Sequence, residues 1–431
     1  MKNKIAYVGM SADIIHEGHI NILKHASKFG KVVVGLLTDE AISTYKKIPI
    51  LSYHQREIIL KNIKQVHKVI PQRTHDYSEN LLKIRPDFVV HGNDWRKGVQ
   101  KKIRQKVLHV IKKWPCKLIE PKYTENISSS NIKSKIIKAG TNPQTRVSRL
   151  KRILEIKKIV RVLESHNSLT GLIIENLNIM KNNKFYEFDG MWSSSLTDSL
   201  TRGKPDNQSV DYSTRMLGLS EIMDVTTKPV IFDADNGGRL EHIPYLVKSL
   251  ERVGVSAIIF EDKKGLKKNS LFSDQKGAAQ DSIKNFCNKI SVAKTASNSK
   301  DLFIIARVES FILKQGLNDA LKRAEAYSRS GADAILIHSK ENNPNEIFSF
   351  AKKFSKSRFF KPLVAVPSTY SKTNEKQLIK NGFRIVIYAN QMLRAAYPAM
   401  YEAAESILKN QRAFDIEKKI TPIKKIISLV K

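Results

Sequence analysis

The sequence predicts an α/β protein that consists of a doubly wound parallel sheet followed by a (β/α)8 barrel. Two observations support this fold class. Short apolar runs alternate with helical patterns, and eight such runs follow one another from about residue 160. The 431 residues leave room for two or three domains with separate cores. We expect domains at residues 1–137 and 147–431, joined by a linker at 138–146 that contains Gly140, Asn142 and Pro143.

Four apolar runs predict the strands of the N-terminal domain. They lie at residues 5–8, 32–37, 87–90 and 117–119, with helical stretches between them. Strands that alternate with helices favour a parallel sheet covered on both faces, as in Rossmann-like domains. Ligands of such sheets bind outside the carboxyl ends of the strands.

Eight apolar runs predict the strands of the barrel: 160–164, 189–194, 229–233, 257–261, 302–306, 334–338, 363–366 and 384–388. Barrels of this type place their active sites at the carboxyl ends of the strands. Polar residues stand at or just past most of these ends: Ser194, Asp233 with Asp235, Glu261, Arg307 with Glu309, His338, Ser368 and Asn390. So uniform a polar set indicates a functional site.

A lysine-rich loop follows the fourth predicted barrel strand. It runs Glu261-Asp-Lys-Lys-Gly-Leu-Lys-Lys-Asn-Ser270. Such a loop is typical of a mobile cover over an anionic substrate, although taken alone it would favour a solvated basic loop. Asp233, Asp235 and Glu261 supply the hard oxygen ligands that a divalent cation such as Mg²⁺ requires. Together these features favour a cation and a phosphorylated substrate.

Arg307 and His338 complete the predicted barrel site. The planar guanidinium of Arg307 suits a carboxylate or phosphoryl group, and His338 could donate to an oxyanion. Each has a structural alternative: a salt bridge between Arg307 and Glu309, and a histidine satisfied within the fold. The whole set of strand ends favours the functional interpretation.

Residues from about 150 onwards resemble phosphoenolpyruvate phosphomutase, of the isocitrate lyase superfamily. The run from Glu261 to Ser270 matches the signature E-D-K-x5-N-S. Other matching segments are Ser165-His-Asn-Ser, Asp233-Ala-Asp235, Ala306-Arg-Val-Glu309, Arg323-Ala-Glu-Ala-Tyr and His338-Ser-Lys340. The K-[KR]-C-G-H loop of the superfamily's lyases is absent, so cleavage of isocitrate is disfavoured.

The resemblance implies a role for each matching residue. Asp233 would bind Mg²⁺ directly, while Asp206, Asp235 and Glu261 would act through waters. The substrate would be contacted by Ser194, Arg307, His338 and Asn269, with Lys267 and Asn269 on a gating loop. The implied reaction moves the phosphoryl group of phosphoenolpyruvate from oxygen to C3, which gives 3-phosphonopyruvate. Phosphonopyruvate hydrolase is the alternative, and Asn269 favours the mutase.

In the N-terminal domain, His16 and His19 open the first predicted helix, three residues apart above the carboxyl edge of the sheet. A metal site is possible, but no third ligand is evident, and a phosphate site at the helix N-terminus is better supported. Three further segments support it: Lys46-Lys47, His91-Gly-Asn-Asp94-Trp95, and residues 127–130.

In this order the segments of residues 4–137 resemble the cytidylyltransferases of the glycerol-3-phosphate and ethanolamine-phosphate type. The resemblance implies that His16 and His19 stabilise the phosphorus centre as CTP loses pyrophosphate. The nucleotide would be bound by Lys46 or Lys47, Arg56, Asp94, and Ser128, Ser129 and Ser130. Two departures bear on the acceptor and on activity: Tyr123 stands where the family has an arginine, and Met10-Ser-Ala-Asp13 replaces G-T-F-D.

Together the two domains resemble the bifunctional enzymes of phosphonate biosynthesis, including the fosfomycin pathway. The barrel would form the C–P bond. The N-terminal domain would attach CMP to a downstream phosphonate such as 2-hydroxyethyl- or 2-aminoethylphosphonate. The alternative is an active barrel with an N-terminal domain that only binds nucleotide.

The formal net charge of +34 admits a remote alternative, a basic nucleic-acid-binding protein. The lysines are scattered and few aromatics accompany them, so attraction of anionic metabolites is the better interpretation. No apolar run is long enough to span a membrane, and no signal peptide is evident. The two cysteines fit a reducing compartment, and we expect a cytoplasmic homo-oligomer, a dimer or tetramer formed through the barrel.

Overall fold

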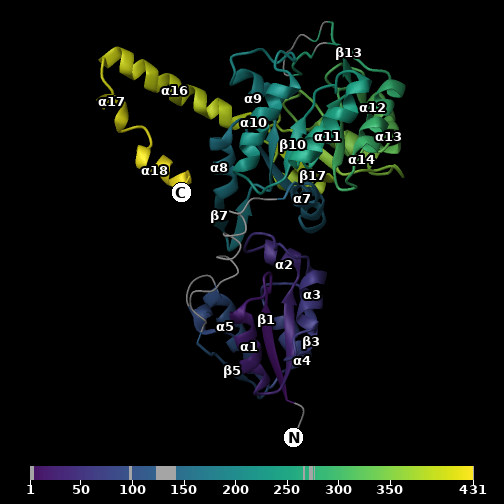
Figure 1. Ribbon diagram of the computed structural model, residues 1–431. Helices are drawn as coiled ribbons and strands as arrows, with labels where there is room; N and C mark the ends of the chain where they lie inside the picture. The colour runs from purple at the N-terminus through teal and green to yellow at the C-terminus, as the bar shows by residue number, and fades with distance from the viewer. Residues whose placement is uncertain are drawn as a thin grey trace. The chain divides into compact units, whose positions relative to one another are not determined.

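The computed structural model describes residues 4–96, 100–122, 142–265, 267–270, 275 and 277–430. The chain divides into two compact units (Figure 1). One comprises Met1–Gly140 together with Asn178–Tyr186, and the other Thr141–Leu177 together with Glu187–Lys431.

The first unit contains a parallel sheet of five strands in the order β3-β2-β1-β4-β5. The predicted doubly wound sheet is therefore confirmed. The strands are β1 (Ile5–Met10), β2 (Lys31–Leu37), β3 (Val66–Gln72), β4 (Phe88–Val90) and β5 (Lys117–Ile119). The sequence does not reveal β3, because this edge strand exposes His67 and Lys68 and so lacks a continuous apolar run.

Helices cover both faces of this sheet. They are α1 (Glu17–Ser27), α2 (Asp39–Ser43), α3 (Tyr53–Lys61), α4 (Ser78–Ile84), the short 3-10 helix η1 (Asn93–Arg96) and α5 (Lys101–Ile111). Strand residues alternate between two cores. Ala6 and Val8 share a core with residues of α1 and α3, whereas Tyr7 packs with residues of α4 and α5.

The strand order reverses direction between β1 and β4, and such switch points are where ligands bind in open parallel sheets. Gly9 near the end of β1 is needed there. A Cβ at this position would lie 2.4 Å from a ring atom of Tyr77, whose hydroxyl donates to the Gly9 carbonyl at 3.2 Å.

The second unit contains the closed parallel barrel that the sequence predicts, and all eight predicted strands are present. In spatial order the barrel runs β10-β11-β14-β15-β16-β17-β6-β9. The strands are β6 (Val160–Glu164), β9 (Gly190–Ser193), β10 (Val230–Asp233), β11 (Ala257–Glu261), β14 (Phe303–Val308), β15 (Ala334–Ile337), β16 (Leu363–Ala365) and β17 (Phe383–Tyr388).

Helices pack around the barrel, most of them through buried apolar residues. In chain order they are α7 (Pro143–Ile156), α8 (Ser168–Asn176), α9 (Ser195–Leu200), α10 (Tyr212–Asp224), the 3-10 helix η3 (Leu240–His242) leading into α11 (Ile243–Val253), α12 (Ile283–Ala296), α13 (Gly316–Arg329), α14 (Asn345–Phe354) and α15 (Glu375–Lys380). Helix α7 begins earlier than expected. Pro143 occupies its first turn and the Asn142 side chain accepts from the Gln144 N–H, so residues 143–146 of the predicted linker are helical.

Two hairpins interrupt the alternation of strands and helices. Strands β7 (Asn178–Lys181) and β8 (Lys184–Glu187) belong to the first unit except for Glu187, and their turn residues Asn182 and Asn183 have φ of 53° and 60°. Asparagine is one of the residues that tolerates this left-handed conformation. Strands β12 (Lys263–Lys264) and β13 (Ala279–Gln280) pair antiparallel at the base of the lysine-rich loop.

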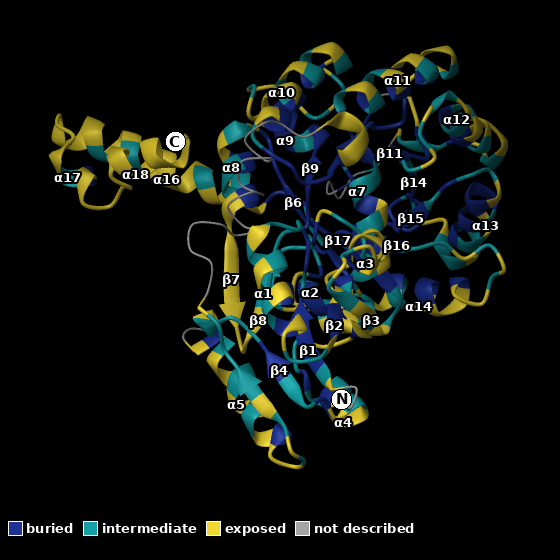
Figure 2. Cartoon of the chain, turned by 60° about the horizontal axis from the view of Figure 1, so that its bottom comes forward, coloured by how far each residue is buried: buried dark blue, intermediate teal, exposed yellow. Residues whose placement is uncertain are grey.

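The helix after the last barrel strand differs from the other barrel helices. No residue of α16 (Gln391–Asn410) is buried, and Tyr397, Met400 and Leu408 are 65%, 61% and 79% exposed. Figure 2 shows this helix and the segments after it largely in the colour of exposed residues. Those segments are α17 (Phe414–Glu417), α18 (Ile423–Ile427) and the 3-10 helix η4 (Ser428–Val430). None of the helices in the described part of the chain has the length and apolar character to cross a bilayer.

Candidate functional site

Buried carboxylates meet at the carboxyl end of the barrel. Asp233 ends β10 and Glu261 ends β11, the neighbouring strand, and Asp235 lies two residues past β10. Their exposed fractions are 2%, 1% and 4%. Asp206 joins them from the loop between α9 and α10. Four carboxylates in so little solvent require compensating positive charge.

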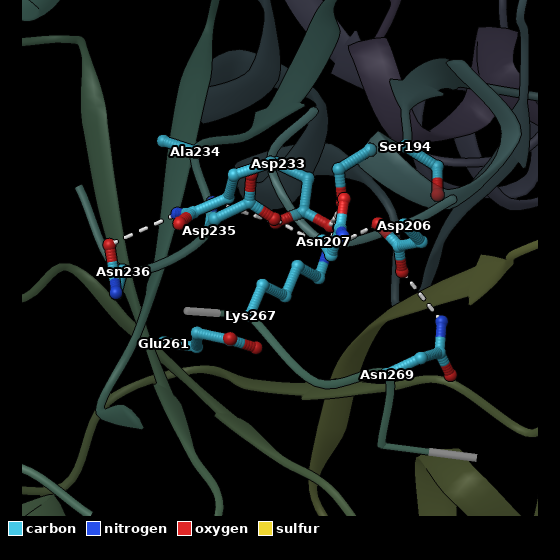
Figure 3. Close-up of polar contacts among 12 residues, drawn as sticks. Ser194, Asp206, Asn207, Asp233, Ala234, Asp235, Asn236, Glu261, Lys267 and Asn269 are labelled. Atoms are coloured by element: carbon cyan, nitrogen blue, oxygen red, sulfur yellow. Dashed lines mark hydrogen bonds and ion pairs between the residues drawn. The ribbon is translucent and has the colours of Figure 1, made fainter. Parts of the chain in front are cut away.

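Lys267 supplies that charge within the protein. Its ammonium donates to the Asp235 carboxylate at 2.5 Å and to the Ser195 hydroxyl, and it lies 3.1 Å from Asp206 Oδ1. Ser195 in turn donates to Asp233 Oδ2 at 3.1 Å. Figure 3 shows the Lys267 side chain ending among these acidic groups. The loop lysine is therefore part of the acidic cluster and does not extend into solvent.

The cations determine which carboxyl groups stay ionised. Burial alone would raise the pKa of Asp233, but the charges of Lys267, Arg307 and Arg215 lower it overall. Burial raises the pKa of Glu261 to about 7, and Arg307 and Lys263 offset this only in part. Burial would lower the pKa of Lys267, but the surrounding carboxylates raise it instead.

Two features fix the position of the β10 end. The buried guanidinium of Arg215, from α10, donates to the Asp233 carbonyl at 2.6 Å and to Asp198 Oδ2 at 2.9 Å. Asp235 adopts φ of +50°, in the left-handed region that is uncommon for residues other than glycine, and its carbonyl accepts from the Glu261 N–H at 2.7 Å. Backbone strain of this kind, held by surrounding contacts, is typical of functional sites.

Arg307, Glu309 and His338 form a second charged group beside the carboxylates. Glu309 Oε1 accepts from Arg307 Nε at 2.6 Å and lies 2.9 Å from His338 Nδ1. The salt bridge considered for Arg307 is therefore present, and Arg307 lines the cavity as well. Burial, followed by the charge of Arg307, lowers the pKa of His338. Burial works to raise the pKa of Glu309, but Arg307, His338 and Lys263 hold it well below the usual range.

Residues of the lysine-rich loop contact both charged groups. Asn269 donates to Asp206 Oδ2 at 2.6 Å (Figure 3). The Ser270 hydroxyl donates to Glu309 Oε2 at 2.6 Å and accepts from Arg307 at 2.9 Å and from Lys263 at 2.8 Å. A hydroxyl has one donor and two acceptor sites, so this buried hydroxyl is fully satisfied.

Most of the predicted barrel residues lie around one cavity of about 50 Å³. Those that line it are Ser194, Asp206, Asp233, Lys267, Asn269, Arg307, His338, Ser368 and Asn390. Asp235 and Glu261 are buried beside them and do not line it. We assigned no role to Ser195, Lys263 and Ser270 from the sequence. Ser195 directly follows Ser194, and Lys263 and Ser270 belong to the signature E-D-K-x5-N-S.

The N-terminal unit contains a larger cavity, of about 530 Å³, at the switch point between β1 and β4. His16 is the N-cap of α1, and its Nδ1 accepts from the Gly18 N–H at 3.2 Å. His19 Nδ1 accepts from the His16 N–H at 3.3 Å. A backbone N–H can only donate, so both rings carry their proton on Nε2. Burial lowers the pKa of both, that of His19 to about 3 with His16 and Lys46 contributing. Both histidines are therefore neutral Nε2–H donors near neutral pH.

Some of the other predicted N-terminal residues line this cavity and others do not. Lys46 and Asp94 line it together with His16 and His19, and Lys46 Nζ donates to the Ser11 hydroxyl at 2.9 Å. Lys47 is not among the lining residues. The sequence left two candidates open, and the position of Lys46 in the cavity makes it the better candidate for contact with phosphate groups.

Arg56 is not among the residues that line this cavity. It is fully buried, and it donates to the Leu37 carbonyl at 2.9 Å, to Asp39 Oδ1 at 2.6 Å and to the Ser11 carbonyl. In this structure Arg56 holds the loop after β1 and does not line the cavity. Ser128, Ser129, Ser130 and Tyr123 lie outside the described residues.

Comparisons with known proteins match two separate parts of the chain to two families. Residues 150–408 match the family described as phosphoenolpyruvate phosphomutase, and residues 7–135 match the family described as cytidylyltransferase-like. A phosphoenolpyruvate phosphomutase from Tetrahymena pyriformis is 34% identical over 295 residues, which cover 68% of this chain and 94% of that protein.

Two solved structures are similar to the barrel. A crystal structure of phosphoenolpyruvate phosphomutase from Streptomyces platensis subsp. rosaceus has a TM-score of 0.61 and 32% identity, and the match covers 66% of this chain and 94% of that one. A phosphonopyruvate hydrolase in complex with oxalate and Mg²⁺ has a TM-score of 0.58 and 30% identity, over 67% and 95%. The chain belongs to the phosphoenolpyruvate phosphomutase family, with a cytidylyltransferase-like domain ahead of the mutase barrel.

Proposed function

We propose that the barrel interconverts phosphoenolpyruvate and 3-phosphonopyruvate. The observation that supports this most is the meeting of two charged groups around one cavity. Asp206 and Asp233 line it, with Asp235 and Glu261 buried beside them, and Arg307 and His338, which contact Glu309, line it as well. The first group suits a cation and the second an anionic substrate. Phosphoenolpyruvate carries both a phosphoryl and a carboxylate group, so its binding would use both the cation site and the anion-binding residues.

The carboxylates fit Mg²⁺. Asp206 Oδ1 and Glu261 Oε2 are buried and make no hydrogen bond within the described part of the chain, although cations lie 3.1 Å and 3.5 Å away. In the same part of the chain, no three or more His, Cys, Asp or Glu side chains are grouped so that they could hold a metal ion directly. We therefore propose that Asp233 would bind Mg²⁺ directly, with Asp206, Asp235 and Glu261 acting through waters. When bound, the ion would neutralise charge on the substrate oxygens.

The protein's own residues would position the phosphoryl group during its transfer. The P–O bond breaks, a P–C bond forms at C3 of the same molecule, and the enol oxygen becomes the ketone of phosphonopyruvate. Arg307 would hold an anionic group of the substrate with its planar guanidinium. His338 Nδ1 lies 2.9 Å from Glu309 Oε1 and 3.0 Å from Arg307 Nη2, so Nε2 is its remaining ring atom for substrate.

Loop residues would keep water away from the transferring group. A space of about 50 Å³ accommodates only about one or two waters. Lys267 and Asn269 must therefore move for substrate to enter, and we propose that they return over it and exclude water. Without that exclusion the phosphoryl group would pass to water, which is the hydrolase reaction. Asn269 and Ser194 would contact the substrate directly.

The first prediction concerns Asp206. Phosphonopyruvate with Mg²⁺ should give a phosphoenolpyruvate signal in ³¹P NMR with the unaltered protein. Asp206→Ala should abolish this conversion, because the cluster loses a carboxylate that contacts both Lys267 and Asn269. Asp224→Ala, which removes an exposed carboxylate at the end of α10, is the matched control and should leave the rate unchanged. Free phosphate as the product of the unaltered protein would show a hydrolase instead.

For the N-terminal domain we propose transfer of CMP from CTP to a phosphonate, with release of pyrophosphate. The support is the cavity at the switch point, with two neutral Nε2–H donors at a helix N-terminus and Lys46 beside them. A two-carbon phosphonate such as 2-hydroxyethyl- or 2-aminoethylphosphonate is the proposed acceptor. The alternative, a domain that binds nucleotide without catalysis, predicts CTP binding and no pyrophosphate.

The second prediction concerns His19. His19→Gln should lower CTP- and phosphonate-dependent pyrophosphate release by about 10²–10³. Glutamine can keep the capping hydrogen bond to the His16 N–H, so the helix start is preserved while the imidazole donor is lost. His54→Ala, at an exposed position of α3, is the control. Barrel turnover should be the same in all three proteins. If His19→Gln releases pyrophosphate at the unaltered rate, the proposed donor role is wrong.

We also propose that the protein is a homo-oligomer in which a second copy covers α16. Tyr397, Met400, Tyr401 and Leu408 lie on one side of this helix, and all are exposed on the chain by itself. The third prediction follows. Sedimentation equilibrium should show a dimer or tetramer that Tyr401→Glu dissociates. Ser406→Glu, on the opposite side of the helix from Tyr397, should not change the mass. A monomeric unaltered protein at micromolar concentration would contradict the proposal.

The remaining expectations stay predictions. We infer that the basic surface attracts anionic metabolites, and steeply salt-dependent DNA binding would favour the nucleic-acid alternative instead. Cys116 and Cys287 are both unpaired, which is compatible with a reducing, cytoplasmic environment.

A further inference from the structure

Asp262 and the segment Arg323-Ala-Glu-Ala-Tyr327, which have no role in the proposed chemistry, meet in the barrel. Asp262 is the middle residue of Glu261-Asp-Lys263 and is fully buried. Its Oδ2 accepts from the hydroxyl of Tyr327 at 2.8 Å and lies 3.4 Å from Arg323 Nη1. Arg323 and Tyr327 are the first and last residues of the Arg-Ala-Glu-Ala-Tyr segment, one turn apart on α13. The two motifs thus form one buried network.

Arg323 and Gln280 make further hydrogen bonds in this network. Arg323 Nη1 donates to the Tyr327 hydroxyl and to the Asp281 carbonyl, each at 2.8 Å, and its Nε donates to Asp319 at 2.8 Å. Gln280, on β13, donates to Asp262 Oδ2 at 2.8 Å. Asp262 is therefore the shared acceptor for side chains from α13 and from the base of the lysine-rich loop.

The same aspartate holds the backbone that presents Arg307 and Glu309. Asp262 Oδ1 accepts from the Glu309 N–H at 3.0 Å, and the Asp262 N–H donates to the Arg307 carbonyl at 3.1 Å. The Glu309 side chain then contacts Arg307 at 2.6 Å and His338 at 2.9 Å. One continuous series of hydrogen bonds therefore connects α13, Asp262, Glu309 and the two residues proposed to meet the substrate.

We propose that Asp262, held by Arg323 and Tyr327, is a positioning residue that sets the place of Glu309 and, through it, of Arg307 and His338. It does not line the cavity and acts only through these neighbours. The kinetic part of this inference rests on the proposed mutase reaction; the placement of His338 does not.

Asp262→Asn tests the proposal with little change in volume. In either orientation of the amide, its nitrogen would face a donor, the Glu309 N–H on one side or Gln280 and Arg323 on the other, so the network must shift. With phosphonopyruvate and Mg²⁺ we expect kcat to fall about 10- to 100-fold, as for a small misplacement of reacting groups. The KM should change less than kcat, and a larger share of product should be free phosphate. Tyr327→Phe should show the same pattern more weakly.

The experiment includes a readout that does not need the reaction. In protein labelled with ¹⁵N-histidine, the imidazole signals of His338, assigned with His338→Gln, should shift in Asp262→Asn. Ser328→Ala is the matched control. Ser328 neighbours Tyr327 on α13 and is buried, and its hydroxyl has no hydrogen-bond partner in the described part of the chain. Its removal should leave both the signals and kcat unchanged.

A double-mutant cycle tests whether Asp262 acts through Glu309. If Asp262 acts through Glu309, the kcat of Asp262→Asn with Glu309→Gln should equal that of Glu309→Gln alone, whereas independent effects would multiply. Unshifted His338 signals in Asp262→Asn would overturn the proposal, as would a fall in kcat that only follows the folded fraction. If the unaltered protein converts no phosphonopyruvate, the proposed function fails, and the His338 signals alone decide whether Asp262 positions this group.

Discussion

The arrangement of the barrel site depends on the burial of several carboxylates at one end of the barrel. Asp206, Asp233, Asp235 and Glu261 stand where water cannot solvate their charge, so each needs a cation or hydrogen-bond donors nearby. Lys267 meets that need from the loop, and Arg215 and Arg307 meet it from the barrel. Because these cations come from different segments, the electrostatic requirement of the cluster ties the loop to the strand ends.

The carboxylate cluster and the group of Arg307, Glu309 and His338 are held in place by different contacts. The carboxylates are held by Lys267 and Asn269 of the lysine-rich loop. Arg307 and His338 are held by Glu309, whose backbone is fixed by Asp262 and α13. The proposed movement of Lys267 and Asn269 would leave the Asp262–Glu309 contact intact, while Ser270 of the same loop also contacts Glu309 and Arg307. Preorganised charge is the main contribution that a protein can make to a reaction in which a phosphoryl group simply changes partners.

All eight barrel strands could be predicted because most are short, largely buried apolar runs with a polar residue at or soon after the end. The sequence did not reveal β3, an edge strand with two consecutive exposed residues, His67 and Lys68, or the β7–β8 hairpin, whose turn is Asn182-Asn183. At the sites, residue types and motif spacing were enough to gather Asp233, Arg307 and His338 around one cavity. They were not enough to separate Lys46 from Lys47, or to show that Arg56 supports a loop, since burial and contact depend on the fold. A lysine-rich run is compatible with exposure to solvent, so the sequence did not reveal that Lys267 lies within the acidic cluster.

The central claim is that the carboxylates form a cation site with which the Lys267 ammonium competes. Calorimetric titration of Mg²⁺ into Lys267→Met, with no substrate present, tests it most directly. The account predicts that Mg²⁺ binds this variant more tightly than the unaltered protein, because a positive charge that contacts Asp235 and Asp206 has gone, while turnover is lost. Lys264→Met, at an exposed position two residues after Asp262, should match the unaltered protein. Weaker Mg²⁺ binding by Lys267→Met would contradict the account.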